Sequence, residues 1–274
     1  INKVKNLKTT SIEVVFLFKQ YKYICKMENE VSKIFGIRAI IEAINSGKTI
    51  SKVFLQKDLS GHLFSELNTL IKKHNIASSF VPVEKLNRLS KNSNHQGVVA
   101  QTSAIDFIDL EDLIADTLEK TTTPLFLLLD KISDVRNFGA IIRTAECTGV
   151  DGIIIQKQGN APVSADTIKT SAGAAFKVPV CKVDHIKDAV FQLQAEEIQI
   201  VAATEKTTTL IYDIDLTLPT AIIMGSEDRG INPSILKIVE HKAKLPLLGE
   251  IESLNVSVAC GAFLYEATRQ RLKG

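Results

Sequence analysis

The sequence predicts an α/β fold: a mostly parallel sheet with both faces covered, preceded by a smaller α/β unit. Short apolar runs alternate with helix-like segments from residue 125 onward. A continuous apolar run is typical of a parallel strand that is buried on both faces. The chain has 274 residues, of which 45% are apolar and 23% charged. This length and composition are sufficient for two globular units with a sizeable core.

The composition disfavours several classes of protein. No apolar run is long enough to span a membrane, and no small-residue cleavage site follows the apolar residues 14–17. The four cysteines are scattered and form no Cys-x-x-Cys pair: Cys25, Cys147, Cys181 and Cys260. Such scattering disfavours a zinc site or a disulfide framework. We therefore expect a cytoplasmic protein without a membrane anchor or a bound metal.

Basic charge is concentrated in the first part of the chain. Residues 1–106 carry 16 Lys and Arg against 8 Asp and Glu, a net charge of +8, whereas residues 107–274 carry 17 against 23, a net charge of −6. A basic surface favours a polyanionic partner such as RNA. Much of the excess lies in residues 1–26, because residues 27–106 alone carry only +3 (10 minus 7).

The Lys-rich segment 1–26 shows little hydrophobic periodicity. We expect it to be non-native upstream sequence before a start at Met27, or alternatively a disordered basic arm. Little packing is expected in either case.

Residues 27–103 are predicted to form the smaller α/β unit. Apolar residues at helical spacing and short apolar runs alternate here, with Gly47 placed to end the first helix. His95, just before the last strand, is expected to be a turn residue rather than a ligand. The expected elements are a loop and helix within 34–44, a strand at 51–55, a helix at 63–75, a strand at 77–83, a short helix at 85–89 and a strand at 97–101.

Residues 104–123 are predicted to be a linker with a short acidic helix, and residues 124–274 the larger unit. Strands are expected at 125–130, 152–156, 178–181, 198–203, 220–225 and 243–246, and helices at 139–147, 165–175, 186–196, 233–239 and 253–273. Ligands of such sheets bind at the carboxyl ends of the strands. Polar residues that follow these strands are therefore candidates for a site.

The first polar stretch, residues 134–145, follows the strand at 125–130. Asn137 and Gly139 open a helix, and Arg143 lies nearly two turns further along among apolar residues. An arginine is expensive to bury there unless it meets an anionic partner. The alternative is a surface helix whose arginine is solvated.

The second polar stretch, residues 224–231, directly follows the strand at 220–225. Gly225 and Gly230 permit close approach of the backbone to a ligand, and Glu227 lies between them. The stretch lacks the Gly-Lys-Ser/Thr of a phosphate-binding loop and the Gly-x-Gly-x-x-Gly of a dinucleotide fold. On its own it is weak evidence for a site.

The third polar stretch begins the final helix. Ser253 is a good candidate for the N-cap, and Asn255 places a side-chain amide in the first turn. Apolar residues follow at the spacing of one helix face: Leu254, Val258, Ala262 and Tyr265. A helix amino terminus can receive a ligand. The alternative is a capped core helix with Asn255 on an exposed turn.

Taken together, the three stretches resemble the SpoU (TrmH-like) family of RNA ribose 2′-O-methyltransferases within the knotted SPOUT class. The residues that carry the likeness occur in the family's order: Asn137, Gly139, Arg143; Gly225, Glu227, Gly230; Ser253, Leu254, Asn255 and Val256. Residues 32–101 are similar to the family's small RNA-binding domain, and the likeness is strongest to the subgroup that methylates a guanosine of large-subunit (23S) ribosomal RNA. Asp228 stands where glycine is common.

The resemblance implies the chemistry. It implies transfer of a methyl group from S-adenosylmethionine to a ribose 2′-hydroxyl, without a metal, in a domain with a trefoil knot. The implied catalytic residues are Arg143, Asn137, Glu227, Asn255 and Ser253. The backbone that would hold the cofactor surrounds Thr204, Gly225, Leu245 and Leu254. Arg143 would be either the base or an electrostatic aid in deprotonating the hydroxyl, and the sequence leaves this open.

The resemblance also implies a homodimer with its active site near the subunit interface, to which Val258, Phe263 and Leu264 of the final helix could contribute. Three other functions stay open at this point. They are a transfer RNA methyltransferase of the same family, a non-catalytic RNA-binding module, and a nucleotide-dependent oxidoreductase on a doubly wound sheet. The missing glycine fingerprint disfavours the last of these.

Overall fold

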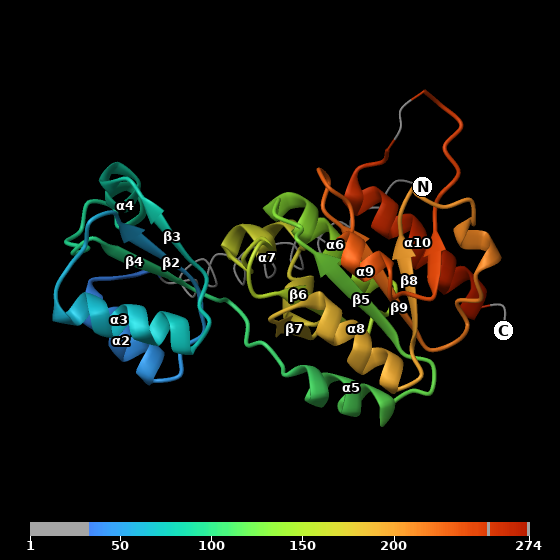
Figure 1. The fold of residues 1–274 in the computed structure, drawn as a ribbon, viewed down its shortest axis with the longest axis horizontal. Coiled ribbons are helices and arrows are strands. Elements are labelled where there is room, and N and C mark those ends of the chain that lie inside the picture. The colour runs from blue at the N-terminus through green and yellow to red at the C-terminus, as the bar shows by residue number, and fades with distance from the viewer. Residues whose placement is uncertain (1–32, 251–252, 273–274) are drawn as a thin grey trace, which may run out of the picture.

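The protein forms two α/β units, each built on its own sheet (Figure 1). The structure, a computed structural model, describes residues 33–250 and 253–272. The prediction for residues 1–26 lies outside these ranges. Within them, no helix combines the length and the apolar character that a membrane span requires.

The first unit is a four-stranded sheet in the order β1-β4-β2-β3. Two helices cover one face around an apolar cluster, and a short third helix packs on the other face. Its elements are β1 (Lys33–Phe35), α2 (Ile37–Asn45), β2 (Ile50–Gln56), α3 (His62–Lys73), β3 (Ser78–Val81), α4 (Val83–Leu89) and β4 (Val98–Thr102). Strand β1 falls where a loop was expected, because its three residues become a strand only by pairing with β4, far along the chain.

The second unit is a six-stranded sheet in the order β10-β8-β9-β5-β6-β7. Every neighbouring pair in it is parallel, which confirms the predicted fold class. Its strands are β5 (Leu125–Asp130), β6 (Gly152–Gln156), β7 (Val180–Val183), β8 (Gln199–Ala203), β9 (Thr220–Gly225) and β10 (His241–Ala243). Its helices are α5 (Leu110–Leu118), α6 (Val135–Cys147), α7 (Ala165–Thr170), α8 (Ile186–Ala195), α9 (Pro233–Leu236) and α10 (Val256–Arg271), with 3-10 turns at Ala174–Phe176 and Ile211–Asp213. The trefoil knot stays a prediction from the family resemblance.

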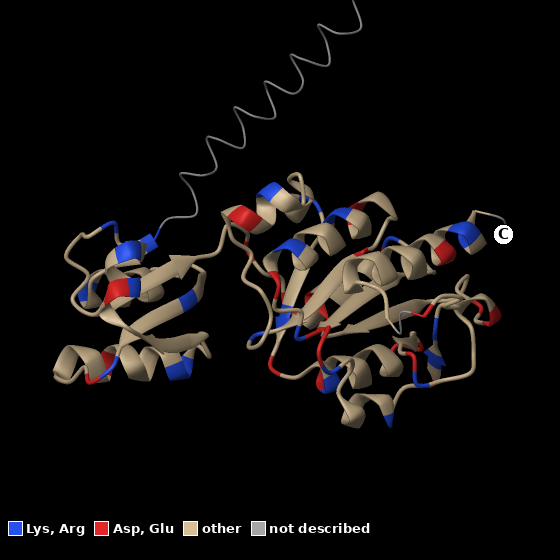
Figure 2. Ribbon diagram, turned by 90° about the horizontal axis from the view of Figure 1, so that it is seen from above, with Lys and Arg blue, Asp and Glu red and all other residues tan. Residues whose placement is uncertain are grey.

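Helices cover both faces of this second sheet (Figure 2). Strand β5 shows the consequence residue by residue: Leu125, Leu127 and Leu129 belong to the cluster under α6, α7 and α10. The alternate residues Phe126 and Leu128 belong to the cluster under α5, α8 and α9. All six residues of the strand are buried, which explains why the first five form an uninterrupted apolar run before Asp130.

The segment predicted as a linker, residues 104–123, contributes to the second unit. It contains α5, whose Leu110, Leu113 and Ile114 are buried in the cluster on one face of the sheet. Ile108 adds a parallel bridge to Cys181 at the edge of the sheet. A Cβ at Gly152 would lie 2.8 Å from Leu113, so the helix packs directly on β6. The acidic residues on the outer face of this helix are the reason that the segment was predicted to be a linker.

Candidate active site

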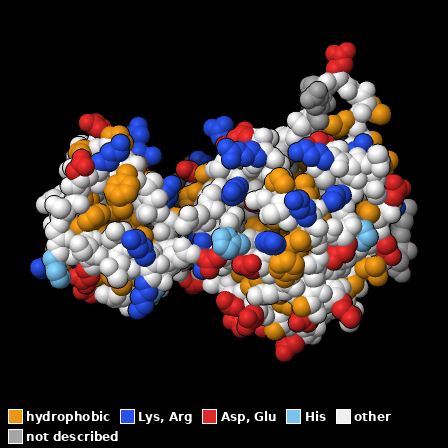
Figure 3. All heavy atoms as spheres, viewed as in Figure 1, with side chains coloured by type: hydrophobic (Ala, Val, Ile, Leu, Met, Phe, Trp, Pro, Cys, Tyr) orange, Lys and Arg blue, Asp and Glu red, His pale blue; other side chains and the backbone are white. Residues whose placement is uncertain are grey.

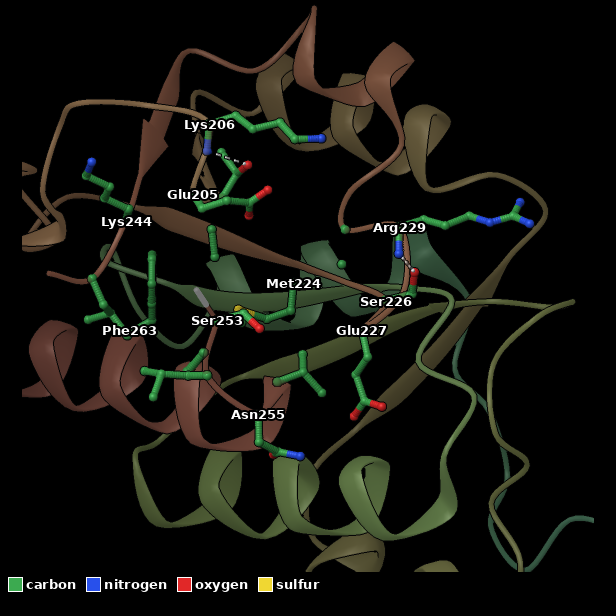
Figure 4. Close-up of a pocket in the computed structure, with 18 of the residues that line it drawn as sticks. Glu205, Lys206, Met224, Ser226, Glu227, Arg229, Lys244, Ser253, Asn255 and Phe263 are labelled. Atoms are coloured by element: carbon green, nitrogen blue, oxygen red, sulfur yellow. Dashed lines mark hydrogen bonds between the residues drawn. The ribbon is translucent and has the colours of Figure 1, made fainter. Parts of the chain in front are cut away.

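A cavity of about 480 Å³ opens where three neighbouring strands end (Figure 4). Strands β10, β8 and β9 are adjacent, and their carboxyl ends lead into the loops that form the cavity wall. The residues just before α10 close the opposite side. This is the position at which open parallel sheets bind ligands, and the volume suits a small molecule.

The four residues implied as cofactor contacts all line this cavity: Thr204, Gly225, Leu245 and Leu254. Thr204 comes directly after β8, and its hydroxyl accepts a hydrogen bond from the backbone N–H of Lys206 at 3.3 Å. Its own N–H donates to the carbonyl oxygen of Ala243 at 2.9 Å. The side chain of Thr204 therefore shapes the loop, and the loop's backbone and the apolar leucines form the wall.

The loop after β9 requires Gly225 for its own closure. Gly230 donates its N–H to the carbonyl oxygen of Ser226 at 2.8 Å, which folds residues 226–230 into a tight turn. A Cβ at Gly225 would lie 2.2 Å from both the carbonyl carbon of Gly230 and the nitrogen of Ile231. Gly230 has φ +66°, a left-handed conformation that favours glycine. The two glycines thus allow the backbone at Gly225 to lie close to the backbone at Gly230 and Ile231. The sequence alone suggested instead that they permit close approach of a ligand.

The amino end of α6 presents a polar residue to this loop. Asp134 caps the helix by accepting hydrogen bonds from the N–H groups of Arg136 and Asn137, at 2.8 and 2.9 Å. The helix consequently begins at Val135, four residues before the predicted start. Gly139 is needed for packing, because a Cβ there would lie 2.6 Å from Thr170 of α7.

Three of the predicted catalytic residues form one chain of hydrogen bonds. The amide of Asn137 donates to a carboxylate oxygen of Glu227, and the amide of Asn255 donates to the carbonyl oxygen of Asn137 at 3.1 Å. The carbonyl oxygen of Asn255 in turn accepts from the N–H and hydroxyl of Ser257, at 2.9 and 2.6 Å. Figure 4 shows the side chains of Glu227 and Asn255 pointing to the same side of the cavity. One carboxylate oxygen of Glu227 stays available on an exposed side chain.

The N-cap of α10 is Asn255, so the prediction of Ser253 as the cap was wrong. Both side chains can accept a backbone hydrogen bond, but the helix begins only at Val256. Ser253 and Leu254 lie outside the helix and line the cavity. The later start of the helix thus leaves these two residues in the segment that forms part of the cavity wall.

Arg143 is not brought into the cavity of its own chain. It is exposed on α6, and it makes no hydrogen bond or ion pair with any residue in 33–250 or 253–272. Six residues separate it from Asn137, which is about 9 Å along a helix and about two-thirds of a turn around it. The predicted positioning of Arg143 by Asn137 and Glu227 is therefore absent within this chain. Arg143 instead precedes Thr144, which lies against Gly261 of α10.

The apolar stripe predicted on α10 exists but faces outward. Leu254, Val258 and Tyr265 are 45%, 57% and 57% exposed. The buried face is a different set of residues: Val256, Cys260, Phe263, Leu264 and Ala267. Of the three residues proposed for a subunit contact, Val258 remains accessible, while Phe263 and Leu264 pack in the core.

Several further lining residues were not among the predicted catalytic or cofactor-binding residues. Buried apolar side chains form part of the wall: Met224, Val256 and Phe263. Charged residues of both signs lie at the rim: Glu205, Lys206, Asp228, Arg229 and Lys244. Lys244 directly follows β10 and Lys206 lies three residues after the end of β8, so the strand-end rule would have found both. Phe263 lies deep in a helix, and only packing brings it to the cavity.

Comparison with known families agrees with this geometry. The model of the SpoU rRNA Methylase family matches residues 124–265, and a model described as RNA 2′-O ribose methyltransferase substrate binding matches residues 33–107. The chain belongs to the SpoU methylase family. The first match contains the whole cavity and the hydrogen-bond chain, and the second contains the four-stranded sheet.

Two curated relatives cover nearly the full chain. The putative TrmH family tRNA/rRNA methyltransferase YacO of Bacillus subtilis is 31% identical over 245 residues, which are 89% of this chain and 98% of the relative. The 23S rRNA (guanosine-2′-O-)-methyltransferase RlmB of Coxiella burnetii is 34% identical over 245 residues, 89% of this chain and 97% of that protein. The predicted membership of a TrmH-like RNA methyltransferase family is thereby confirmed.

Solved structures show the same fold. The SpoU methyltransferase AviRb of Streptomyces viridochromogenes, crystallised with AdoMet, has a TM-score of 0.57 and 24% identity, covering 94% of this chain and 99% of that chain. The A. aeolicus TrmH/SpoU tRNA modifying enzyme has a TM-score of 0.50 and 31% identity, covering 60% of this chain and 83% of its own.

Proposed function

We propose that this protein transfers a methyl group from S-adenosylmethionine to the ribose 2′-hydroxyl of a guanosine in large-subunit (23S) ribosomal RNA. The observation that carries the proposal is the cavity at three strand ends, bordered by the Glu227–Asn137–Asn255 chain, in a member of an RNA methylase family. The relative RlmB, which spans both units, supports the guanosine target. Such a substrate would place the reaction in the cytoplasm.

The cavity lining fits S-adenosylmethionine. Its apolar wall includes Met224, Leu245 and Phe263, and its rim carries groups of both charges, so it suits a ligand that has an aromatic base and a charged amino-acid end. Backbone around Thr204, Gly225 and Leu254 would hold it. When bound, this cofactor supplies a methyl group that is already activated by its sulfonium. The protein then needs to align the acceptor hydroxyl and assist the loss of its proton.

The hydrogen-bond chain would orient the substrate. Glu227 accepts from Asn137 through one oxygen, which leaves the other oxygen to accept a hydrogen bond from a hydroxyl of the RNA. Asn137 cannot rotate freely, because its carbonyl oxygen is held by Asn255. Ser253 would close the same pocket. A network in which each amide is fixed at both ends is preorganised for such a task.

Arg143 would stabilise the negative charge that develops on the 2′-oxygen. A guanidinium keeps its positive charge at ordinary pH, so it acts as an electrostatic aid more readily than as a base. Because Arg143 does not line the cavity of its own chain, we propose that the enzyme is a homodimer in which Arg143 of one copy completes the site of another. The exposed stripe of α10, which includes Val258 and Tyr265, would lie in the subunit contact.

We further propose a division of labour, in which residues 27–103 bind the RNA and residues 124–274 carry the reaction. The match of residues 33–107 to a substrate-binding model supports it. The modest basic excess of residues 27–106, a net charge of +3 against −6 for residues 107–274, supports it too.

The test is transfer of a labelled methyl group from S-adenosylmethionine to unmodified large-subunit ribosomal RNA and, separately, to unmodified transfer RNA. We expect label on a ribose 2′-oxygen of the ribosomal RNA. Arg143→Ala should lower kcat by about 100-fold or more, because one charge-stabilising donor is lost. Arg136→Ala, which removes another exposed arginine of α6, should leave kcat unchanged. Arg143→Lys keeps the positive charge but loses the planar guanidinium, so its kcat should lie between those of the wild type and Arg143→Ala.

Subunit mixing tests the shared site. An Arg143→Ala copy and an Asn255→Ala copy, each inactive alone, should regain activity when mixed, because one of the two sites in a mixed dimer is intact. Label on transfer RNA alone would overturn the ribosomal substrate but keep the chemistry. Absence of S-adenosylmethionine binding would overturn the methyltransferase proposal.

A further inference from the structure

A second cavity lies at the junction of the two units, away from the candidate active site. Its volume is about 260 Å³, room for roughly eight water molecules at about 30 Å³ each. The two lobes meet at a waist, with basic side chains on both sides of it (Figure 3). The cavity is lined by residues of both units, among them Lys48, Thr49, His74, Phe107, Lys157 and Lys182.

Lys182 is an unusual residue for its position. It lies on β7, where its partner in the ladder is Ile155 and its neighbour on the same face is Val180, both buried. Its amine lies 3.8 Å from the centroid of the Phe107 ring. Among the residues that the structure describes, the amine makes no hydrogen bond and no ion pair. Burial, and to a lesser extent the charge of Lys157, lowers the pKa of Lys182 to about 8. An anion beside this amine would relieve both effects.

The other ionisable groups that line this cavity are also basic. They are Lys48, His74 and Lys157. Two acids beside them are already engaged. Asp184 pairs with Lys157 at 3.0 Å through one oxygen and accepts from the amide of Asn75 through the other. Asp106 accepts from the hydroxyl of Thr49 at 3.4 Å. Because Asp184 holds Lys157 in place without entering the lining, the cavity keeps a surplus of positive charge.

The ring contact of Lys182 does not by itself explain the arrangement. Lys187 makes the same kind of contact with the exposed Phe191, at 5.6 Å, on the surface of α8. A cation–ring contact is worth about 0.5–2 kcal/mol and needs no second lysine and no cavity. At Lys182 the ring contact occurs in the lining of a cavity that Lys157 also lines. The two positive charges repel each other, and an anion bound between them would offset this repulsion.

We propose that this cavity, hereafter the junction site, binds a phosphate group. The phosphate would lie between Lys182 and Lys157 of the second unit and Lys48 of the first unit. The Lys amines are donors suited to phosphate oxygens, whereas the hydroxyl of Thr49 already donates to Asp106 at 3.4 Å. One phosphate would contact both units, and so would fix how they lie relative to each other. Two sources share this chemistry: a phosphodiester of the RNA substrate, which rests on the proposed function, and free inorganic phosphate.

The amine of Lys182 provides a readout that does not depend on methyl transfer. At pH 8, an amine with a pKa of about 8 is about half neutral, whereas one at the ordinary 10.5 is below about 1% neutral. A bound phosphate should therefore slow acylation of Lys182 by about 100-fold. The measurement is competitive labelling of the intact protein with an amine-acylating reagent, read by mass spectrometry. Inorganic phosphate is titrated at constant ionic strength, and a fragment of unmodified large-subunit ribosomal RNA is titrated separately.

Lys187 serves as the matched control, since it also lies over a phenylalanine but outside the junction site. Its labelling should change by less than about twofold. Lys157→Met should weaken the protection of Lys182 by about tenfold or more through the loss of one charge-assisted contact, and Lys187→Met should leave it unchanged. Thermal melting confirms that each variant is folded.

Protection of Lys182 by both ligands supports the junction site with RNA as its occupant. Protection by inorganic phosphate alone supports the site with a free anion as its occupant. Unchanged labelling of Lys182 at saturating phosphate and RNA overturns the inference, as does equal protection of Lys182 and Lys187. A protein that fails to transfer methyl groups but still shows selective protection would overturn the proposed function and leave the junction site intact.

Discussion

The two ends of α10 meet the same sheet in opposite ways. At the amino end, Asn255 is exposed, caps the helix and continues as a chain of hydrogen bonds to Asn137 and Glu227. At the carboxyl end, Gln270 and Arg271 reach inward and bind backbone groups of other segments. The first end lies at the carboxyl edge of the strands, where the cavity opens, and the second lies at their amino edge.

Two residues at the carboxyl end of α10, Gln270 and Arg271, hold neighbouring segments through hydrogen bonds, and we call this pair the latch. Arg271 donates four hydrogen bonds to backbone carbonyl oxygens at 2.7–3.1 Å: those of Leu216, Thr123, Pro124 and Leu218. Gln270 donates to the carbonyl oxygen of Ile214 at 3.0 Å and accepts from the N–H of Leu216 at 2.8 Å. These carbonyls precede β5 and β9, so one helix end fixes the entry of two central strands. One edge of the sheet thus carries the candidate active site, and the opposite edge carries the hydrogen bonds of Gln270 and Arg271.

The largest loss of stability is expected from Arg271→Ala, which tests the difference between the two ends of α10. The change leaves several carbonyl groups without their donor, which should lower the free energy of unfolding by about 2–4 kcal/mol. Urea denaturation measures this effect. Arg143→Ala removes an exposed arginine without partners in the described chain and should change stability by less than about 0.5 kcal/mol. Equal losses in the two variants would contradict the assignment of the latch.

Asn255→Ala should lower stability less than Arg271→Ala does, and it should lower methyl transfer more. It removes the N-cap, which is worth about 1 kcal/mol, and also the donor to Asn137. The measurement pairs urea denaturation with kcat for methyl transfer at saturating substrate. A folded variant with undiminished kcat would show that Asn137 does not need Asn255 to be held in place.

Asn255→Asp separates the cap from the hydrogen-bond chain. A carboxylate still accepts from the N–H of Ser257 and suits the positive end of the helix, but it cannot donate to Asn137. Stability should stay within about 0.5 kcal/mol of the wild type, while kcat falls by about tenfold, or about 1.4 kcal/mol.

The smallest effect is expected at Cys260, which lies in α10 between the two ends. Burial raises the pKa of Cys260 to about 12, so the thiol should resist alkylation while the exposed Cys147 reacts. Asn255→Asp should change the alkylation rate of Cys260 by less than about twofold, because only the first turn is touched. Arg271→Ala should accelerate it, because opening of the latch exposes the helix. Rapid alkylation of Cys260 in the wild type would refute the buried position of this helix.

The fold of the second unit was predictable where burial is complete. Strands β5, β6 and β9 have the bounds expected from their apolar runs. A strand covered on both faces is apolar along its interior, and the polar residues Asp130, Gln156 and Thr220 stand at the strand ends. Strand β1 and the packing of α5 were not predictable, since one depends on pairing with β4 and the other on a contact with β6.

The sequence by itself singled out polar residues of the candidate site and the order in which they follow the strands. It named Asn137, Glu227 and Asn255, and the structure joins them across separations of 90 and 118 residues. Only the tertiary structure decided that they bind one another, that Arg143 stays outside the cavity of its own chain, and that the stripe of α10 faces outward. A periodic pattern identifies a helix face but not its direction, because direction depends on which neighbours bury it. The latch at Arg271 and the junction site likewise come from segments that only folding brings together.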